Sequence, residues 1–111
     1  MGGLKVHADN AAVNVNFWVT PDEANLDPDS GGVVIWDVAA PTDWSTAQLN
    51  GDARGCEELI LQRCGRPTSV PYRANRAVVF DSDLLHRTDD FSFKSGYLNR
   101  RISISLLFGA R

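Results

Sequence analysis

The chain has 111 residues, of which 43% are hydrophobic and 23% are charged, a composition that is ordinary for one soluble globular domain. The formal net charge is −3, and the basic residues are scattered apart from Arg100-Arg101. This distribution argues against nucleic acid or an anionic membrane as a partner. No apolar run has the length of a transmembrane segment, and the N-terminus lacks the apolar core of a signal peptide. We therefore expect a cytoplasmic protein that binds small molecules or other proteins.

The first predicted strand covers residues 13–19, where the side chains alternate with a period of two. One face is apolar and consists of Val13, Val15, Phe17 and Val19. The other face carries two amides and an indole, from Asn14, Asn16 and Trp18. Residues 20–32 are rich in turn formers and end in Gly31-Gly32, and a second strand is predicted over 33–36.

A helical insertion is predicted near residues 43–64. Pro41-Thr42-Asp43 is typical of a helix start, and Gly65 is expected to cap the helix C-terminus. Cys56 and Cys64 lie in this stretch; a disulfide between them is possible from the sequence, but reduced thiols are favoured in a cytoplasmic protein.

Strand signals return after Pro67, over residues 69–72, 76–80, 84–88 and 100–108. Several short strands at close spacing, with one helical excursion, predict an all-β sandwich or barrel formed by a single domain. No internal repeat, low-complexity segment or linker divides the chain.

A metal site is indicated by His7-Ala8-Asp9 together with His86, the second of only two histidines in the chain. In a strand, His7 and Asp9 would point to the same face, because side chains alternate. Two imidazoles and one carboxylate, with the remaining positions open, are how non-haem Fe(II) oxygenases hold iron. Either motif alone is more often a surface or turn feature. Together, and with the arginine of the last predicted strand, the two motifs favour a metal site over a surface or turn role.

The last predicted strand sorts cleanly by parity. One face is apolar and is expected to be core, and it carries Ile102, Ile104, Leu106 and Phe108. The other face is expected to line water or a ligand, and it carries Arg101, Ser103, Ser105 and Leu107. An arginine with a hydroxyl two residues on can bind a carboxylate, so Arg101 and Ser103 suit a dicarboxylate. The alternative is an exposed amphipathic strand with Arg101 paired to an acid.

These motifs together resemble the Fe(II)/2-oxoglutarate-dependent oxygenases, including their phytanoyl-hydroxylase-like and prolyl-hydroxylase-like branches. That family shows His-x-Asp, a distal His and Arg-x-Ser/Thr on the last strand of a double-stranded β-helix. The matching residues are His7-Ala8-Asp9, His86 and Arg101-Ile102-Ser103, and the segments 30–35 and 75–82 are similar as well.

The resemblance implies a cupin-like double-stranded β-helix (a jelly roll) over residues 1–111, with one helical insertion. It implies that Fe(II) is held by His7, Asp9 and His86, the metal and catalytic residues. It further implies 2-oxoglutarate bound by Arg101 and Ser103, with Asn14 and Asn16 facing the same side, and Arg100 as the alternative anchor. The expected activity is hydroxylation of a small-molecule or protein substrate.

His7 stands close to the start of the sequence, where family members usually have a further strand and helices. We therefore expect a domain without those elements, and a homodimer formed through the exposed sheet edge. A second interpretation keeps the fold but not the activity: a non-catalytic cupin-type binding or assembly module with a vestigial or empty metal site.

Overall fold

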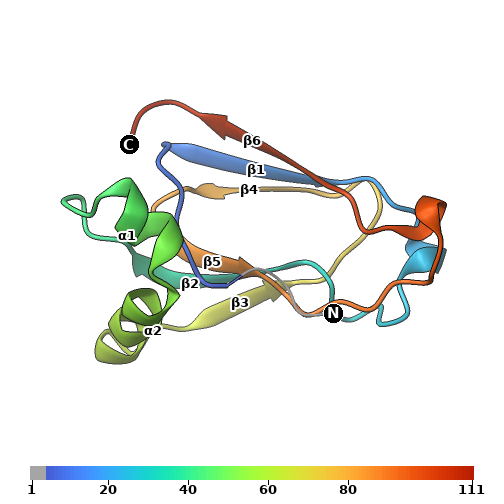
Figure 1. Ribbon diagram of the computed structural model, residues 1–111, viewed down its shortest axis with the longest axis horizontal. Helices are drawn as coiled ribbons and strands as arrows, with labels where there is room; N and C mark the ends of the chain where they lie inside the picture. Colours follow the sequence, from blue (N-terminus) through green and yellow to red (C-terminus); the bar gives the residue numbers. More distant parts are fainter. Residues whose placement is uncertain (1–4) are drawn as a thin grey trace.

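The computed structural model describes residues 5–111, and the first four residues of the predicted domain lie outside it. The described chain is mostly β, with two antiparallel three-stranded sheets that lie as two layers (Figure 1). The first sheet has the order β4-β1-β6, with β4 at Ala77–Asp81, β1 at Val13–Trp18 and β6 at Ser103–Phe108. The coarse prediction of a β-rich domain is therefore confirmed.

The second sheet has the order β3-β2-β5, formed by β3 (Pro67–Val70), β2 (Val33–Ala39) and β5 (Leu84–Thr88). Its β5 edge is extended by one isolated bridge, in which His7 and His86 exchange backbone hydrogen bonds of 2.9 Å in both directions. Along β5 the side chains alternate, so Leu85 packs toward the helices while His86 faces the space between the sheets. This alternation turns the distal histidine inward.

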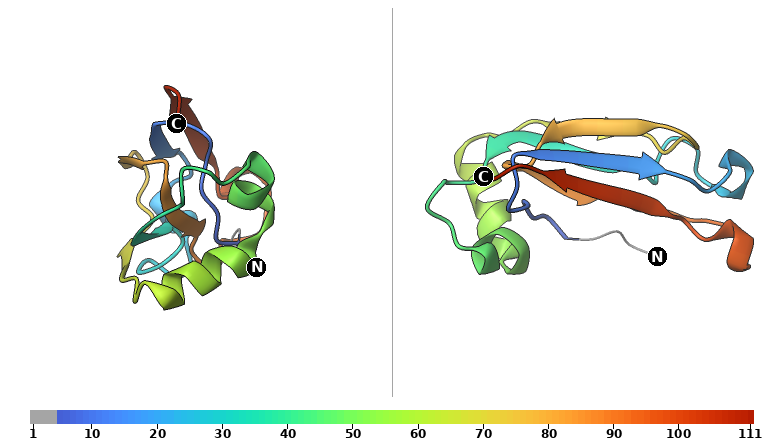
Figure 2. Two further views of the ribbon diagram at one scale, coloured as in Figure 1. Left: turned by 90° about the vertical axis from the view of Figure 1, so that its left-hand side faces the viewer. Right: turned by 90° about the horizontal axis from the view of Figure 1, so that it is seen from above.

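The helical insertion contains two short helices rather than one, α1 (Thr46–Gly51) and α2 (Ala53–Gln62), and both lie at one end of the molecule (Figures 1 and 2). Ser45 and Gln48 form a capping box that starts α1. Asp52 ends α1 and caps α2 through Gly55 N. Because one residue serves both ends, the chain turns sharply between the helices.

The C-terminus of α2 differs from the prediction that Gly65 is the cap. The residue in the left-handed conformation is Cys64, with φ 50°, and its N–H bonds to Leu61 O at 3.2 Å. Gly65 N bonds to Ile60 O at 2.9 Å, which completes a Schellman motif. Glycine is needed at 65 for space instead, since a Cβ there would lie 2.5 Å from a methyl of Val38.

Two separate hydrophobic clusters form the interior. The larger one joins the helices to β2 and β5: Val6, Ala8, Val38, Ala40, Leu49, Cys56, Ile60 and Leu85. The smaller one fills the far end between the sheets, where Trp18, Val33 and Tyr72 pack together and the Trp18 and Tyr72 rings stack at 5.2 Å. A space lined largely by polar side chains remains between the sheets, and it contains the candidate site.

The expectation that Ile102, Ile104, Leu106 and Phe108 are core is wrong. These residues are 46–53% exposed, because they point away from the second sheet. The same holds in β1, where Val13 is exposed while Asn14 and Trp18 are buried. In β1 and β6 the apolar face thus points outward, whereas β4 turns the buried Phe80 inward, against His86. The polar face of β6 lines the cavity as expected, but its apolar face is not core.

The predicted strand boundaries shift by a few residues. The strand predicted from residue 100 starts at Ser103, so Arg101 lies just before it. The strand predicted over residues 69–72 starts at Pro67 and ends at Val70. Cys56 is buried, Cys64 is exposed, and the two thiols are free. No helix in the described part of the chain has the length and apolar character of a membrane span.

Arg111 links the helical insertion to the turn between β4 and β5. Its side chain bonds to Asp83 Oδ1 at 2.6 Å and to backbone carbonyls that include Trp44 O at 3.2 Å and Ala40 O at 3.1 Å. It is 9% exposed. We expect Arg111→Ala to lower the free energy of unfolding by about 2 kcal/mol, because charge-assisted hydrogen bonds are lost.

Urea unfolding followed by circular dichroism measures this loss, and Arg54→Ala is the matched control. Arg54 forms a highly exposed i,i+4 pair with Glu58, so its removal should change stability by less than about 0.5 kcal/mol. Equal effects of the two substitutions would contradict a structural role for Arg111.

Candidate metal and carboxylate site

His7 and Asp9 come from an extended segment beside β5 and not from a regular strand, contrary to the prediction. Only His7 forms a β-bridge, while Asp9 N bonds to Ser82 O at 3.2 Å, at the turn that precedes β5. Ala8 between them is fully buried and its N–H bonds to Leu49 O. The backbone is therefore held on both sides, and both flanking side chains turn toward His86.

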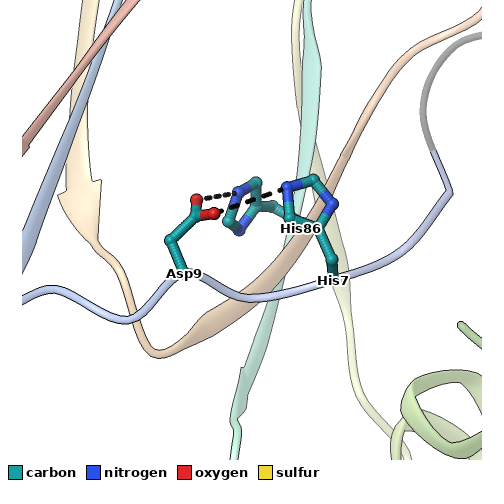
Figure 3. Close-up of side chains that lie close together, drawn as sticks. All are labelled: His7, Asp9 and His86. Atoms are coloured by element: carbon teal, nitrogen blue, oxygen red, sulfur yellow. Dashed lines mark hydrogen bonds and ion pairs between the residues drawn. The ribbon is translucent and has the colours of Figure 1, made fainter. Parts of the chain in front are cut away.

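The three predicted ligands converge, although His7 and His86 lie far apart in the sequence (Figure 3). One ligand atom from each of His7, Asp9 and His86 lies within 4.8 Å of the others. His86 Nε2 is 3.1 Å from Asp9 Oδ2, and His7 Nε2 is 3.9 Å from Asp9 Oδ1. The imidazole rings have a centroid separation of 4.4 Å. These atoms are close enough to share one cation.

The outer nitrogen of each imidazole is held by a backbone carbonyl. His7 Nδ1 lies 2.8 Å from Lys5 O, and His86 Nδ1 lies 2.8 Å from Leu84 O. A carbonyl can only accept, so Nδ1 carries the proton and, in the neutral ring, Nε2 carries a lone pair. The lone pairs of both Nε2 atoms therefore point toward the Asp9 carboxylate. Such a group of acceptors needs a proton or a metal ion between its members.

The electrostatic environment keeps two of these groups in their ligand forms. The contact with His86 Nε2, which donates to Asp9 when it carries a proton, lowers the pKa of Asp9 below its usual value, with burial acting in the opposite direction. Burial, followed by the charge of His86, lowers the pKa of His7. Near neutral pH this gives an ionised carboxylate and a neutral His7 imidazole, the states that bind a metal.

These pKa shifts predict a loss of stability on acidification. The pKa of His7 in the folded protein lies below its ordinary value of 6.5. The contribution of neutral His7 to the free energy of unfolding is therefore complete above pH 6.5 and is lost as the pH falls below it. Asp9 adds a similar loss, but only below its ordinary value of 3.8. In metal-free protein we expect the melting temperature to fall between pH 7.5 and pH 5.5, and to fall less in His7→Gln. An equal fall in the two proteins would contradict the assignment.

Arg101 lies at the other end of the same space. Its Nε donates to Gly31 O at 2.7 Å and its Nη2 to Gly32 O at 3.3 Å. The guanidinium carbon lies 5.6 Å from the Tyr72 ring centroid and 5.4 Å from that of Phe91. Burial lowers the pKa of Arg101, yet a guanidinium stays charged near neutral pH.

No carboxylate within residues 5–111 forms an ion pair with Arg101, although the chain has more acidic than basic residues. The alternative of a structural ion pair is therefore wrong for the described chain. Arg100 is exposed, stacks on Tyr97 at 5.6 Å and is absent from the cavity wall. The structure thus selects Arg101 over Arg100 as the cation that faces this space.

A single cavity of about 350 Å³ connects the two ends. All the predicted site residues line it: His7, Asp9, His86, Arg101, Ser103, Asn14 and Asn16. Asn14 Nδ2 donates to Asp9 Oδ2 at 2.6 Å, which orients the carboxylate, while its buried Oδ1 has no partner in the described structure. Asn16 Oδ1 instead accepts from Ser105 Oγ at 3.0 Å.

The sequence reasoning missed two parts of this cavity. Thr88 lines it, and strand parity could have found this residue because it lies two positions after His86. The carbonyls of Gly31 and Gly32 hold Arg101, and no local sequence pattern indicates that contact. A Cβ at Gly32 would lie 1.8 Å from Val70 O, so glycine is required there.

Comparisons of the chain with protein-family models, with curated proteins and with solved structures found no match.

Proposed function

We propose that this chain is the core of an Fe(II)- and 2-oxoglutarate-dependent oxygenase that hydroxylates an organic substrate. The observation that carries the proposal is one cavity with a His-Asp-His cluster at one end and, at the other, a half-buried arginine that has no acidic partner among residues 5–111. A cation site and an anion site in one cavity suit a ligand that bridges a metal and a guanidinium.

The donor set supports a metal in this cavity. His7, Asp9 and His86 present two imidazole nitrogens and one carboxylate oxygen, which is the set that suits non-haem Fe(II). Their outer-sphere hydrogen bonds, to Lys5 O, Leu84 O and Asn14, are those that orient metal ligands in proteins. Bound iron would supply the oxidation chemistry, for which no side chain of the chain is suited.

The other residues would bind and orient the cosubstrate. Arg101 keeps its Nη1 group without a hydrogen-bond partner among the described residues, and we assign it the distal carboxylate of 2-oxoglutarate. Ser103 would add a hydroxyl beside it, from the same face of the chain. Asn14 orients Asp9 and offers its free Oδ1 to a donor in the cavity. Asn16 completes the polar wall.

We further propose that the two sheets form a double-stranded β-helix of the cupin type. Support comes from the two facing antiparallel sheets, from strand neighbours that are distant in sequence, such as β1 with β6, and from a site between the layers. The metal ligands and Arg101 also follow one another along the chain in the order that the family resemblance implies.

An anaerobic titration with Fe(II), followed by 2-oxoglutarate, tests the proposal. We expect one Fe(II) per chain, and then a visible metal-to-ligand charge-transfer band that saturates with 2-oxoglutarate. Succinate release under air would next report oxidative decarboxylation. A protein that binds neither iron nor 2-oxoglutarate would overturn the proposal.

The second candidate is a non-catalytic binding or assembly module of the same fold. The His86–Asp9 hydrogen bond favours it, since a proton could take the place of a metal between these groups. In that case the titration would show no stoichiometric iron, and His86→Ala would affect stability alone.

A further inference from the structure

The outer face of the β4-β1-β6 sheet carries most of the exposed large hydrophobic residues of the described chain. We define the outer apolar face by its ten apolar residues: Val13, Val15, Phe17 and Val19 from β1 and its end, Ala77 and Val79 from β4, and Ile102, Ile104, Leu106 and Phe108 from β6 and its approach. Strand register makes them one continuous surface, because Val15 lies between Val79 and Leu106, and Phe17 lies between Ala77 and Ile104.

This face is exposed to an unusual degree for apolar side chains. Val79 is 65% exposed, Phe108 is 53%, and the large residues of β6 between them are close to half exposed. Together they present an apolar patch on the order of 600 Å², at the upper end of what a monomer carries. Asp81, at one corner, is the one charged residue in register with this face. Water contact with so large a face is unfavourable.

We propose that the outer apolar face binds the same face of a second copy of this chain, forming a two-fold symmetric sheet-on-sheet dimer. A standard interface buries about 800 Å² on each partner, and the apolar patch alone supplies most of that area. A two-fold interface must complement itself, and an apolar sheet face with almost no charge does so. Aligned packing of two sheets is an ordinary solution for such surfaces.

The edge of the same sheet gives a competing geometry. β6 is an edge strand, and its even-numbered residues turn their backbone groups toward β1. The bonds at the two ends of this pairing show it: Ala12 N donates to Phe108 O at 3.0 Å, and Val19 N donates to Ile102 O at 3.2 Å. The backbone groups of Ser103, Ser105 and Leu107 therefore point outward and could pair with another strand. Edge pairing would leave the outer apolar face exposed to water, so we favour a dimer formed through that face.

The test is the mass of the whole chain by light scattering and by sedimentation across a wide concentration range. We expect twice the mass of one chain, and at least about tenfold weaker association in Val79→Lys, because a charge must be buried. Val79 lies on β4, with β1 between it and β6. Leu61→Lys is the matched control, since Leu61 is 77% exposed on α2 away from this face, and it should leave the association unchanged.

Ser105→Pro separates the two geometries, because it removes an outward N–H while preserving the pairing with β1. A dimer weakened by Ser105→Pro and unaffected by Val79→Lys would overturn the proposal in favour of edge pairing. A strict monomer at every concentration would overturn it as well. Circular dichroism of each variant confirms that the comparison is made between folded proteins. The result is independent of metal binding.

Discussion

His86→Ala is expected to weaken Fe(II) binding at least about a hundredfold, because loss of outer-sphere partners alone costs about 10- to 100-fold at metal sites. His86 is 4% exposed, and its Nε2 lies 3.1 Å from Asp9 Oδ2. Its removal leaves one imidazole and one carboxylate, a much weaker donor set. Anaerobic titration of metal-free protein, with free Fe(II) measured by a chromogenic chelator, gives the affinity.

A buried alanine could also disturb the fold, so Asp9→Asn is the second variant. It is nearly isosteric and can still accept from Asn14, yet it removes the charge that a metal requires. Both variants should lose iron, while Asp29→Asn, an exposed carboxylate outside the cavity, should retain the parent affinity. Retention of tight Fe(II) binding in folded His86→Ala would show that the triad is not the metal site.

The residues of this site could be predicted from the sequence because few residues of the required types are present and their spacing is informative. The chain has two histidines, and a carboxylate stands two residues after the first. Strand parity then grouped Arg101 with Ser103 and Ser105, and all three line the cavity. The bridge that joins His7 to His86 could not be predicted, since it depends on pairing between segments at opposite ends of the sequence.

The fold was harder to predict at the first sheet. Alternation in β1 and β6 correctly separates apolar from polar residues, but the expectation that the apolar face of β6 is core is wrong. Here the inner faces of β1 and β6 line a largely polar cavity, so Asn14 is buried while Ile104 is exposed. Period-two patterns report which residues share a face, and they do not report which face lies inside. The left-handed Cys64 was missed for a similar reason, since Gly65 is the residue that such a cap usually prefers.

Arg101→Gln is expected to weaken 2-oxoglutarate binding at least about tenfold while leaving Fe(II) affinity within about twofold, because charge-assisted pairs to a carboxylate contribute about 1.5–3 kcal/mol. The guanidinium carbon lies within 5.6 Å of the Tyr72 and Phe91 ring centroids, and the carbonyls of Gly31 and Gly32 accept hydrogen bonds from its nitrogens. Its position is therefore set before the ligand arrives. Titration of the iron-loaded protein, followed by visible absorption, measures the affinity.

A purely structural role of Arg101 must be separated from carboxylate binding, because the side chain also ties the segment before β2 to the rest of the chain. 2-Oxobutyrate distinguishes the two roles, since it keeps the 2-oxo acid and lacks the distal carboxylate. The parent protein should prefer 2-oxoglutarate, and Arg101→Gln should bind both compounds with similar weak affinity. A structural defect would weaken both equally and preserve the preference. Arg100→Gln, one residue away and outside the cavity wall, should retain both the affinity and the preference.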